Sequence, residues 1–92
     1  MSLEVNPSAD AQEKQRLFLE RARKGVLKFI LEKGTSVNMG DLHDFTLKKF
    51  FIQHQGFSKL MEGLVEDELV EYHEGPGEFL VTDKGKILAT QE

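Results

Sequence analysis

The residues between positions 48 and 59 have the types best suited to contact an anionic polymer. The group consists of Lys48, Lys49, Gln53, Gln55, Ser58 and Lys59. Lysine and serine side chains contact phosphate oxygens, and glutamine amides pair with the edges of bases. A solvated polar turn would have the same composition, so the pattern leaves both interpretations open.

Catalytic and metal-binding chemistry finds little support in the sequence. There is no cysteine, which excludes a disulfide, a cysteine-containing zinc site and a thiol nucleophile. His43, His54 and His73 lack the spacing of metal ligands, so we expect ordinary surface or half-buried histidines. Residues 75–77 (Gly-Pro-Gly) lack the Lys-Ser/Thr of a phosphate-binding loop, and the acidic residues 66–68 would point in different directions on a helix. We expect a protein that is not an enzyme and holds no metal or cofactor.

Charge is distributed unevenly along the 92 residues, whose net charge is −4. Residues 1–33 carry seven Lys or Arg against five Asp or Glu, and residues 34–55 carry two of each. Residues 56–92 carry three Lys against nine Asp or Glu. This acidic third argues against a uniform nucleic-acid-binding surface, because neutralising phosphates requires clustered cations. The length fits one domain, and no apolar run suggests a membrane span or signal peptide, so we expect a cytoplasmic protein.

The periodicity of residues 11–33 predicts a long first helix. Its apolar stripe consists of Phe18, Leu19, Ala22, Val26, Phe29 and Ile30. Asp10 and Glu13 have the spacing of a capping box, and Gly34 is placed to end the helix in a left-handed conformation. We therefore expect residues 1–10 to be a flexible tail and residues 11–92 to form a single domain.

Three leucines and a basic strip lie off this stripe. They are Leu17, Leu27 and Leu31, with Lys14, Arg21, Lys24 and Lys28. One interpretation is that a neighbouring helix covers the leucines and that water solvates the charges. The other is that this side of the helix forms a homodimer or contacts another partner.

The middle of the chain predicts a short strand followed by helices. Residues 35–39 suit a strand, and Asn38 or Asp41 is a possible cap for the next helix. We expect this helix to end near Phe45, because the apolar face changes near Thr46, and a second short helix over residues 47–54. We expect Gly56 to separate this second helix from the next one. Ser58 is a plausible cap for a helix with an apolar face of Phe57, Leu60, Met61, Leu64 and Val65.

The last third predicts a β-hairpin and a closing helix. Residues 69–73 and 79–82 have β-type composition, and residues 74–78 between them are rich in turn formers. Thr82 or Asp83 is placed to cap a short helix that contains Ile87 and Leu88.

These segments resemble the winged helix-turn-helix transcriptional regulators of the MarR/PadR kind. The resemblance is carried by Leu60, Leu64, Val65, Glu68, Leu69 and Val70, and by the run Phe79-Leu-Val-Thr-Asp-Lys-Gly85. It implies an α+β, mostly helical fold with three or four helices plus a two- or three-stranded β-wing. It also implies a DNA-binding regulator, acting as a homodimer, whose recognition helix lies near residues 58–66.

Acidic residues occupy the positions where this resemblance would place DNA. Glu62 and Glu66 lie on the outward face of the expected recognition helix, and Glu74 and Glu78 flank the hairpin turn. Carboxylates repel phosphates but attract a basic protein. The alternative to DNA binding is therefore an interaction module that contacts a basic protein partner through Glu62, Glu66 and Glu74.

Overall fold

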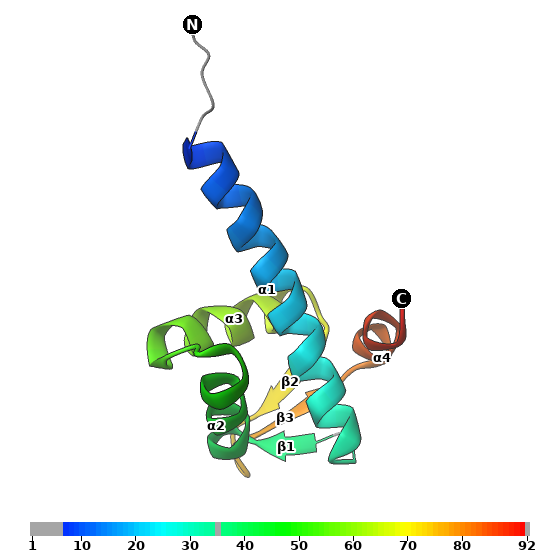
Figure 1. Ribbon diagram of the computed structural model, residues 1–92. Coiled ribbons are helices and arrows are strands. Elements are labelled where there is room, and N and C mark those ends of the chain that lie inside the picture. The colour runs from blue at the N-terminus through cyan, green and yellow to red at the C-terminus, as the bar shows by residue number, and fades with distance from the viewer. Residues whose placement is uncertain (1–6, 35, 92) are drawn as a thin grey trace, which may run out of the picture.

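The computed structural model of the chain describes residues 7–34 and 36–91, with side chains from residue 11 onward. Within these residues the fold is mostly helical α+β, with four helices and a three-stranded antiparallel sheet, which confirms the predicted fold class (Figure 1). The elements are α1 (Pro7–Glu32), β1 (Ser36–Asn38), α2 (Met39–Phe50), α3 (His54–Glu66), β2 (Val70–His73), β3 (Glu78–Val81) and α4 (Asp83–Thr90). This order is compatible with a winged helix.

The helix α1 crosses the body of the protein with its second half and extends beyond it with its first half (Figure 1). The second half buries Ala22, Val26 and Ile30, whereas every side chain of residues 11–21 is exposed. The helix ends at Glu32, and Gly34 has a φ of 96°, which confirms the predicted left-handed stop.

The start of α1 differs from the prediction. The helix begins at Pro7, so Asp10 lies inside it and is not its N-cap, and residues 7–10 are helical where a flexible tail was expected. A proline in the first turn is compatible with this start, because its missing N–H would have no partner in the helix there.

The sheet has the strand order β1-β3-β2, and both pairs are antiparallel. The hairpin of β2 and β3, called the wing below, was predicted, as was the short strand β1; Thr35 of that prediction lies outside the described residues. Phe79 pairs with Val37 on one side and with Tyr72 on the other. At the turn, the Gly77 N–H donates to the carbonyl oxygen of His73 at 2.9 Å.

The helix α2 is continuous from Met39 to Phe50, so the predicted break near Phe45 is wrong. Asn38 caps it as predicted, since its side-chain oxygen accepts a hydrogen bond from the Asp41 N–H at 2.8 Å. Thr46, where the apolar face changes, lies within this helix, and it is fully buried in the protein. Because α2 packs against both α1 and α3, it carries two apolar faces without a break.

The helix α3 begins at His54, so the predicted cap at Ser58 and the break at Gly56 are both wrong. A Cβ atom on Gly56 would lie 3.1 Å from Cγ2 of Ile52, so this glycine leaves room for the side chain of Ile52, which lies just before the helix. The buried face of α3 is as predicted except for Val65, which is 41% exposed.

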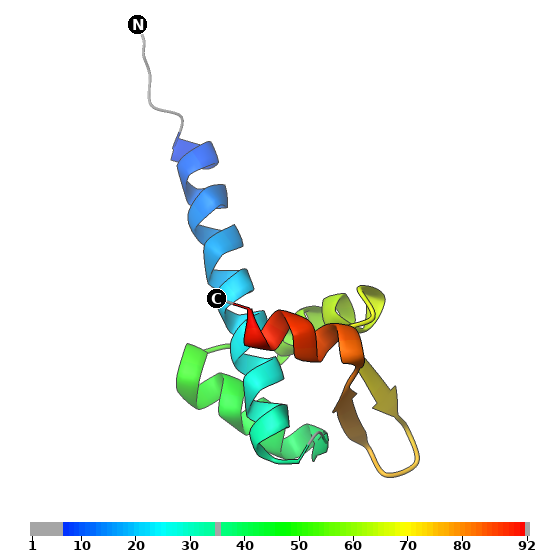
Figure 2. The ribbon, with the colours of Figure 1, turned by 90° about the vertical axis from the view of Figure 1, so that its right-hand side faces the viewer.

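The helix α4 packs against α1 and closes the fold (Figure 2). Thr82 caps it as predicted, with its hydroxyl oxygen accepting a hydrogen bond from the Gly85 N–H at 3.0 Å. Leu27, a candidate partner contact, is fully buried in the core and does not face outward. Leu31 is half-buried against the same core, and Leu17 remains exposed.

No helix in residues 7–34 and 36–91 combines the length and the apolar character that crossing a bilayer requires.

Candidate functional site

The candidate DNA-contact residues all lie where α2 ends and α3 begins, and we call them the turn cluster: Lys48, Lys49, Gln53, Gln55, Ser58 and Lys59. Ser58 is half-buried and the others are exposed. Lys48 forms an ion pair with Asp44 at 3.1 Å. In the described part of the chain, Lys49 and Lys59 form no ion pair, so their charge faces solvent.

The N-terminus of α3 opens into this cluster without a side-chain cap. Gln53 is the N-cap residue and makes no capping hydrogen bond, and the first turn contains no acidic residue. Unpaired N–H groups at a helix start attract anions. The N-terminal end of α3 is therefore the one part of this helix whose electrostatics suit phosphate.

The basic strip of α1 does not extend the turn cluster. Arg21 and Lys24 line a hollow that α1 forms with α4, and Lys28 lines a second hollow along the same two helices. Lys48 and Lys49 instead line a hollow between α1 and α2. The helices α2 and α4 lie on either side of α1 (Figure 1), so these two groups of cations line different hollows and do not form one basic face.

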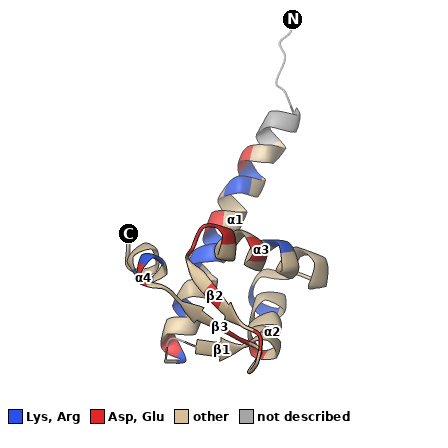
Figure 3. Cartoon of the chain, turned by 180° about the vertical axis from the view of Figure 1, so that it is seen from behind, with Lys and Arg blue, Asp and Glu red and all other residues tan. Residues whose placement is uncertain are grey.

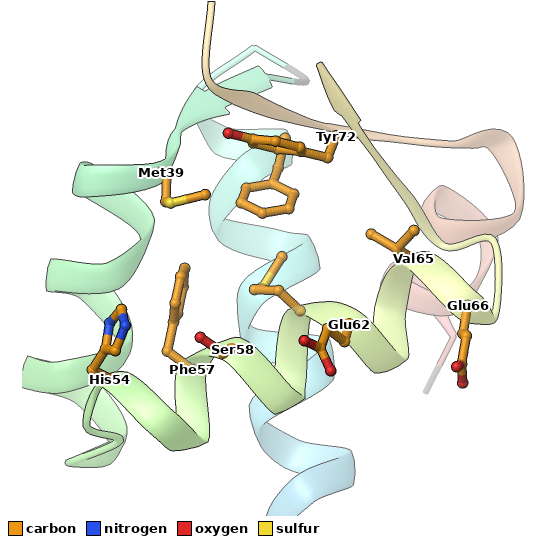
Figure 4. Close-up of a pocket in the computed structure, with 10 residues that line it drawn as sticks. Met39, His54, Phe57, Ser58, Glu62, Val65, Glu66 and Tyr72 are labelled. Carbon is orange, nitrogen blue, oxygen red and sulfur yellow. The ribbon is translucent and has the colours of Figure 1, made fainter. Parts of the chain in front are cut away.

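A groove of about 510 Å³ lies between α3, the start of α2 and the wing (Figure 4). This volume falls within the range of known ligand pockets. We call it the α3–wing groove, and its lining consists of Met39, His54, Phe57, Ser58, Met61, Glu62, Val65, Glu66, Tyr72 and Phe79.

The surface of the α3–wing groove is mainly apolar and partly open to solvent. Its floor is made of buried side chains, among them Phe57 and Phe79. Met39 is 40% exposed, Val65 41% and Tyr72 38%. The Tyr72 ring packs on that of Phe79, with ring centres 4.8 Å apart, which fixes its position at the mouth of the groove. Apolar area of this kind, gathered in a concave site, is typical of a surface that binds another molecule.

Carboxylates form the rim of the groove. Glu62 and Glu66 come from α3 and are exposed, and Glu74 is exposed in the turn of the wing. Figure 3 shows acidic residues on α3, on the segment that follows it and on the wing. None of the described residues that line the groove is a lysine or arginine. The groove therefore presents an apolar floor within a negative field.

An arginine of α1 holds the C-terminal end of α3, the helix that forms one wall of the groove. Arg23 donates hydrogen bonds to the carboxylate of Asp67 and, at 3.2 Å, to the carbonyl oxygen of Gly63. The hydrogen bond and the positive charge of Arg23 hold the pKa of Asp67 below its ordinary value. The charged pair thus fixes the C-terminal end of α3.

Sequence reasoning found part of this groove and missed the rest. Of the three acidic residues predicted as partner contacts, Glu62 and Glu66 line the groove, and Glu74 lies in the turn of the wing outside this lining. Met39 and Tyr72 were not predicted, because they come from different elements that only the folded sheet brings together. A usable signal for Tyr72 was its position two residues after the buried Val70, because residues two apart in a strand point to the same face of the sheet.

The histidines do not form a metal site in the described residues. The rings of His43 and His54 lie with their centres 5.7 Å apart, but no three His, Asp or Glu side chains in residues 11–34 and 36–91 are placed to hold an ion together.

No known protein family, curated protein or solved structure matched the chain when it was compared with each of the three.

Proposed function

We propose that this protein is a winged-helix interaction module whose α3–wing groove binds a basic, apolar segment of a partner protein. The observation that carries the proposal is the combination of exposed Met39, Val65 and Tyr72 with the carboxylates of Glu62 and Glu66 around one concave surface.

The apolar surface of the groove and the carboxylates of its rim would contribute differently to binding. Covering its exposed apolar surface would contribute about 25 cal/mol for each Å² removed from water. The carboxylates would select a cationic partner and accelerate its approach, more than they would strengthen the final complex. The same carboxylates would repel the phosphates of a duplex, so a nucleic acid is a poor occupant for this groove.

A synthetic amphipathic peptide of leucine and lysine, about 14 residues or four helical turns long, tests this proposal. With a fluorescent label, we expect binding with a dissociation constant on the order of 10 μM. The double variant Glu62→Lys/Glu66→Lys should bind at least about tenfold more weakly, because it places two cations at the rim.

Two controls separate groove binding from general charge attraction. The variant Glu32→Lys changes an exposed carboxylate of α1 outside the groove and should leave the affinity nearly unchanged. A peptide with glutamine in place of leucine keeps the charge and should bind much more weakly. Equal binding of both peptides, or equal effects of the rim and α1 variants, would refute the proposal.

A second candidate function, DNA binding by a transcriptional regulator, is favoured by a different observation. Lys49 and Lys59 flank the uncapped start of α3, where Gln53 and Gln55 are exposed. Together with the resemblance to MarR/PadR-type regulators, these residues support contacts to phosphates and base edges by the N-terminal half of α3 alone. A homodimer would then place two copies on two half-sites.

Fluorescence anisotropy with a labelled duplex tests this second candidate. At about 50 mM salt and micromolar protein, a nucleic-acid-binding protein gives a clear increase that salt abolishes. Lys59→Glu should weaken binding strongly, whereas Lys84→Glu, which makes the same charge change on α4, should weaken it only slightly. An anisotropy that does not change at low salt would exclude DNA binding of this kind.

A further inference from the structure

Phe51 has an unusual conformation for its residue type. It ends α2 with φ 58° and ψ 30°, a left-handed conformation that helix ends usually assign to glycine or asparagine. Phe51 is 84% exposed, more than any other large apolar residue in the described part of the chain. Both the backbone conformation and the exposed ring are unfavourable in an isolated copy. The left-handed helix end is held by hydrogen bonds from the Phe51 and Ile52 N–H groups to the carbonyl oxygens of Leu47 and Thr46. The exposed ring has no such compensation, since it makes no aromatic contact with the described residues.

The surroundings of Phe51 are apolar and basic. Leu47, one helical turn earlier, is 40% exposed. Lys48 and Lys49 form the basic last turn of α2. We call Leu47, Lys48, Lys49 and Phe51 the Phe51 knob. A projecting aromatic side chain beside cations has the chemistry proposed above for the occupant of the α3–wing groove.

We infer that the Phe51 knob of one copy docks in the α3–wing groove of a second copy of this chain. This inference rests on the proposed function, because it assigns a partner to the same groove. The ring of Phe51 packs against the apolar floor near Met39 and Tyr72, and Lys48 and Lys49 face Glu62 and Glu66. Aromatic anchors in pockets commonly dominate the energetics of protein interfaces.

The contact joins two different surfaces, so each copy has both a knob and a groove. Such contacts extend from copy to copy unless they close into a ring or a reciprocal pair. A copy without a working knob still has a groove, and a copy without a working groove still has a knob. Two defective variants should therefore associate with each other, which gives the inference a direct test.

Sedimentation velocity on the full chain at about 100 μM is the test, because weak interfaces are populated at such concentrations. Wild type should sediment faster than a monomer. Phe51→Asn, which removes the ring, and Val65→Arg, which places a cation in the groove, should each sediment as a monomer. An equimolar mixture of these two variants should again contain a species heavier than the monomer.

Stability measurements exclude unfolding as the cause. Asparagine suits the left-handed position, so the melting temperature of Phe51→Asn should equal or exceed that of wild type at low concentration. Ile87→Gln, which replaces another exposed apolar residue on α4, should leave association unchanged.

Three results would overturn the inference: a monomeric wild type, a Phe51→Asn variant that associates like wild type, or a mixture that stays monomeric. A monomeric wild type that still binds the leucine-lysine peptide would refute self-association alone. Failure to bind the peptide would refute the proposed function instead. Association that Leu17→Gln abolishes and Phe51→Asn does not would place the contact on the first helix.

Discussion

Arg23 of α1 forms an ion pair with Asp67, which directly follows α3, and its guanidinium also donates a hydrogen bond to the Gly63 carbonyl oxygen. The two interactions attach the C-terminal end of α3 to α1, the first helix of the chain. They do not line the α3–wing groove themselves. They add to the buried core that holds α3, which forms one wall of the groove, against α1.

The Arg23–Asp67 pair predicts a pH dependence of stability. The pKa of Asp67 is lowered in the folded state, mainly by the hydrogen bond from Arg23. A carboxyl group with a lowered folded pKa stabilises the fold fully above its ordinary pKa of 3.8, and the contribution disappears as the pH falls through the folded pKa. Asp67→Asn should therefore destabilise the protein more at pH 7 than near pH 2. Urea unfolding at both pH values measures this, and an equal loss at both would contradict it.

We expect the addition of one methyl group at Gly85 to reduce the stability of the fold severely. A Cβ atom there would lie 2.2 Å from the carbonyl oxygen of Leu69, in a backbone segment that cannot easily move. We expect Gly85→Ala to reduce the free energy of unfolding by about 3 kcal/mol, the upper part of the range for overpacking. Gly75→Ala is the matched control, because a Cβ atom on Gly75 meets nothing within 4 Å. Chemical denaturation should show a near-neutral effect for the control, and similar effects of the two variants would refute the explanation.

We expect truncation to alanine to reduce stability strongly at Leu27 and hardly at all at Leu17. Leu27 is fully buried and Leu17 is 47% exposed on the projecting part of α1. Leu27→Ala should cost about 2–5 kcal/mol of stability, because it leaves a cavity in the core. Leu17→Ala should change stability by about 0.5 kcal/mol or less. Thermal unfolding of the two variants at low concentration compares them, and a large loss for Leu17→Ala would indicate a buried contact.

The wing, the end of α1 and the starts of α2 and α4 could be predicted from the sequence because local chemistry determines them. The turn formers of residues 74–78 separate two short β-type runs, and the hairpin follows from that pattern alone. Asn38 and Thr82 are capping residues that act on N–H groups three residues ahead. Gly34 supplies a left-handed stop that few other residues adopt easily.

The boundary between α2 and α3 was misplaced because its residues contradict local preference. Phe51 occupies a left-handed position, which glycine usually fills, inside the predicted helix 47–54, and Gly56 lies inside a helix where a break was expected. Gly56 allows close approach to Ile52, and we propose that Phe51 is retained for a contact with another copy.

The groove lay beyond sequence reasoning for a different reason. Met39 begins α2 and Tyr72 belongs to β2, and they reach the same groove because β1 leads directly into α2 and pairs with β3. Periodicity along one element does not show such a combination. Only the acidic rim was visible, as an unexplained charge on the expected recognition helix.

The measurement that tests the central proposal most directly is a titration of isotope-labelled protein with the leucine-lysine peptide, followed by amide chemical shifts. In the Phe51→Asn variant, which lacks the knob, we expect the largest shift changes at Met39, Val65 and Tyr72, and little change at Lys49 and Lys59. The same experiment with a short duplex should leave the groove residues unaffected. Peptide-induced changes confined to the turn cluster, or the absence of any change at millimolar peptide, would contradict the α3–wing groove as the binding site.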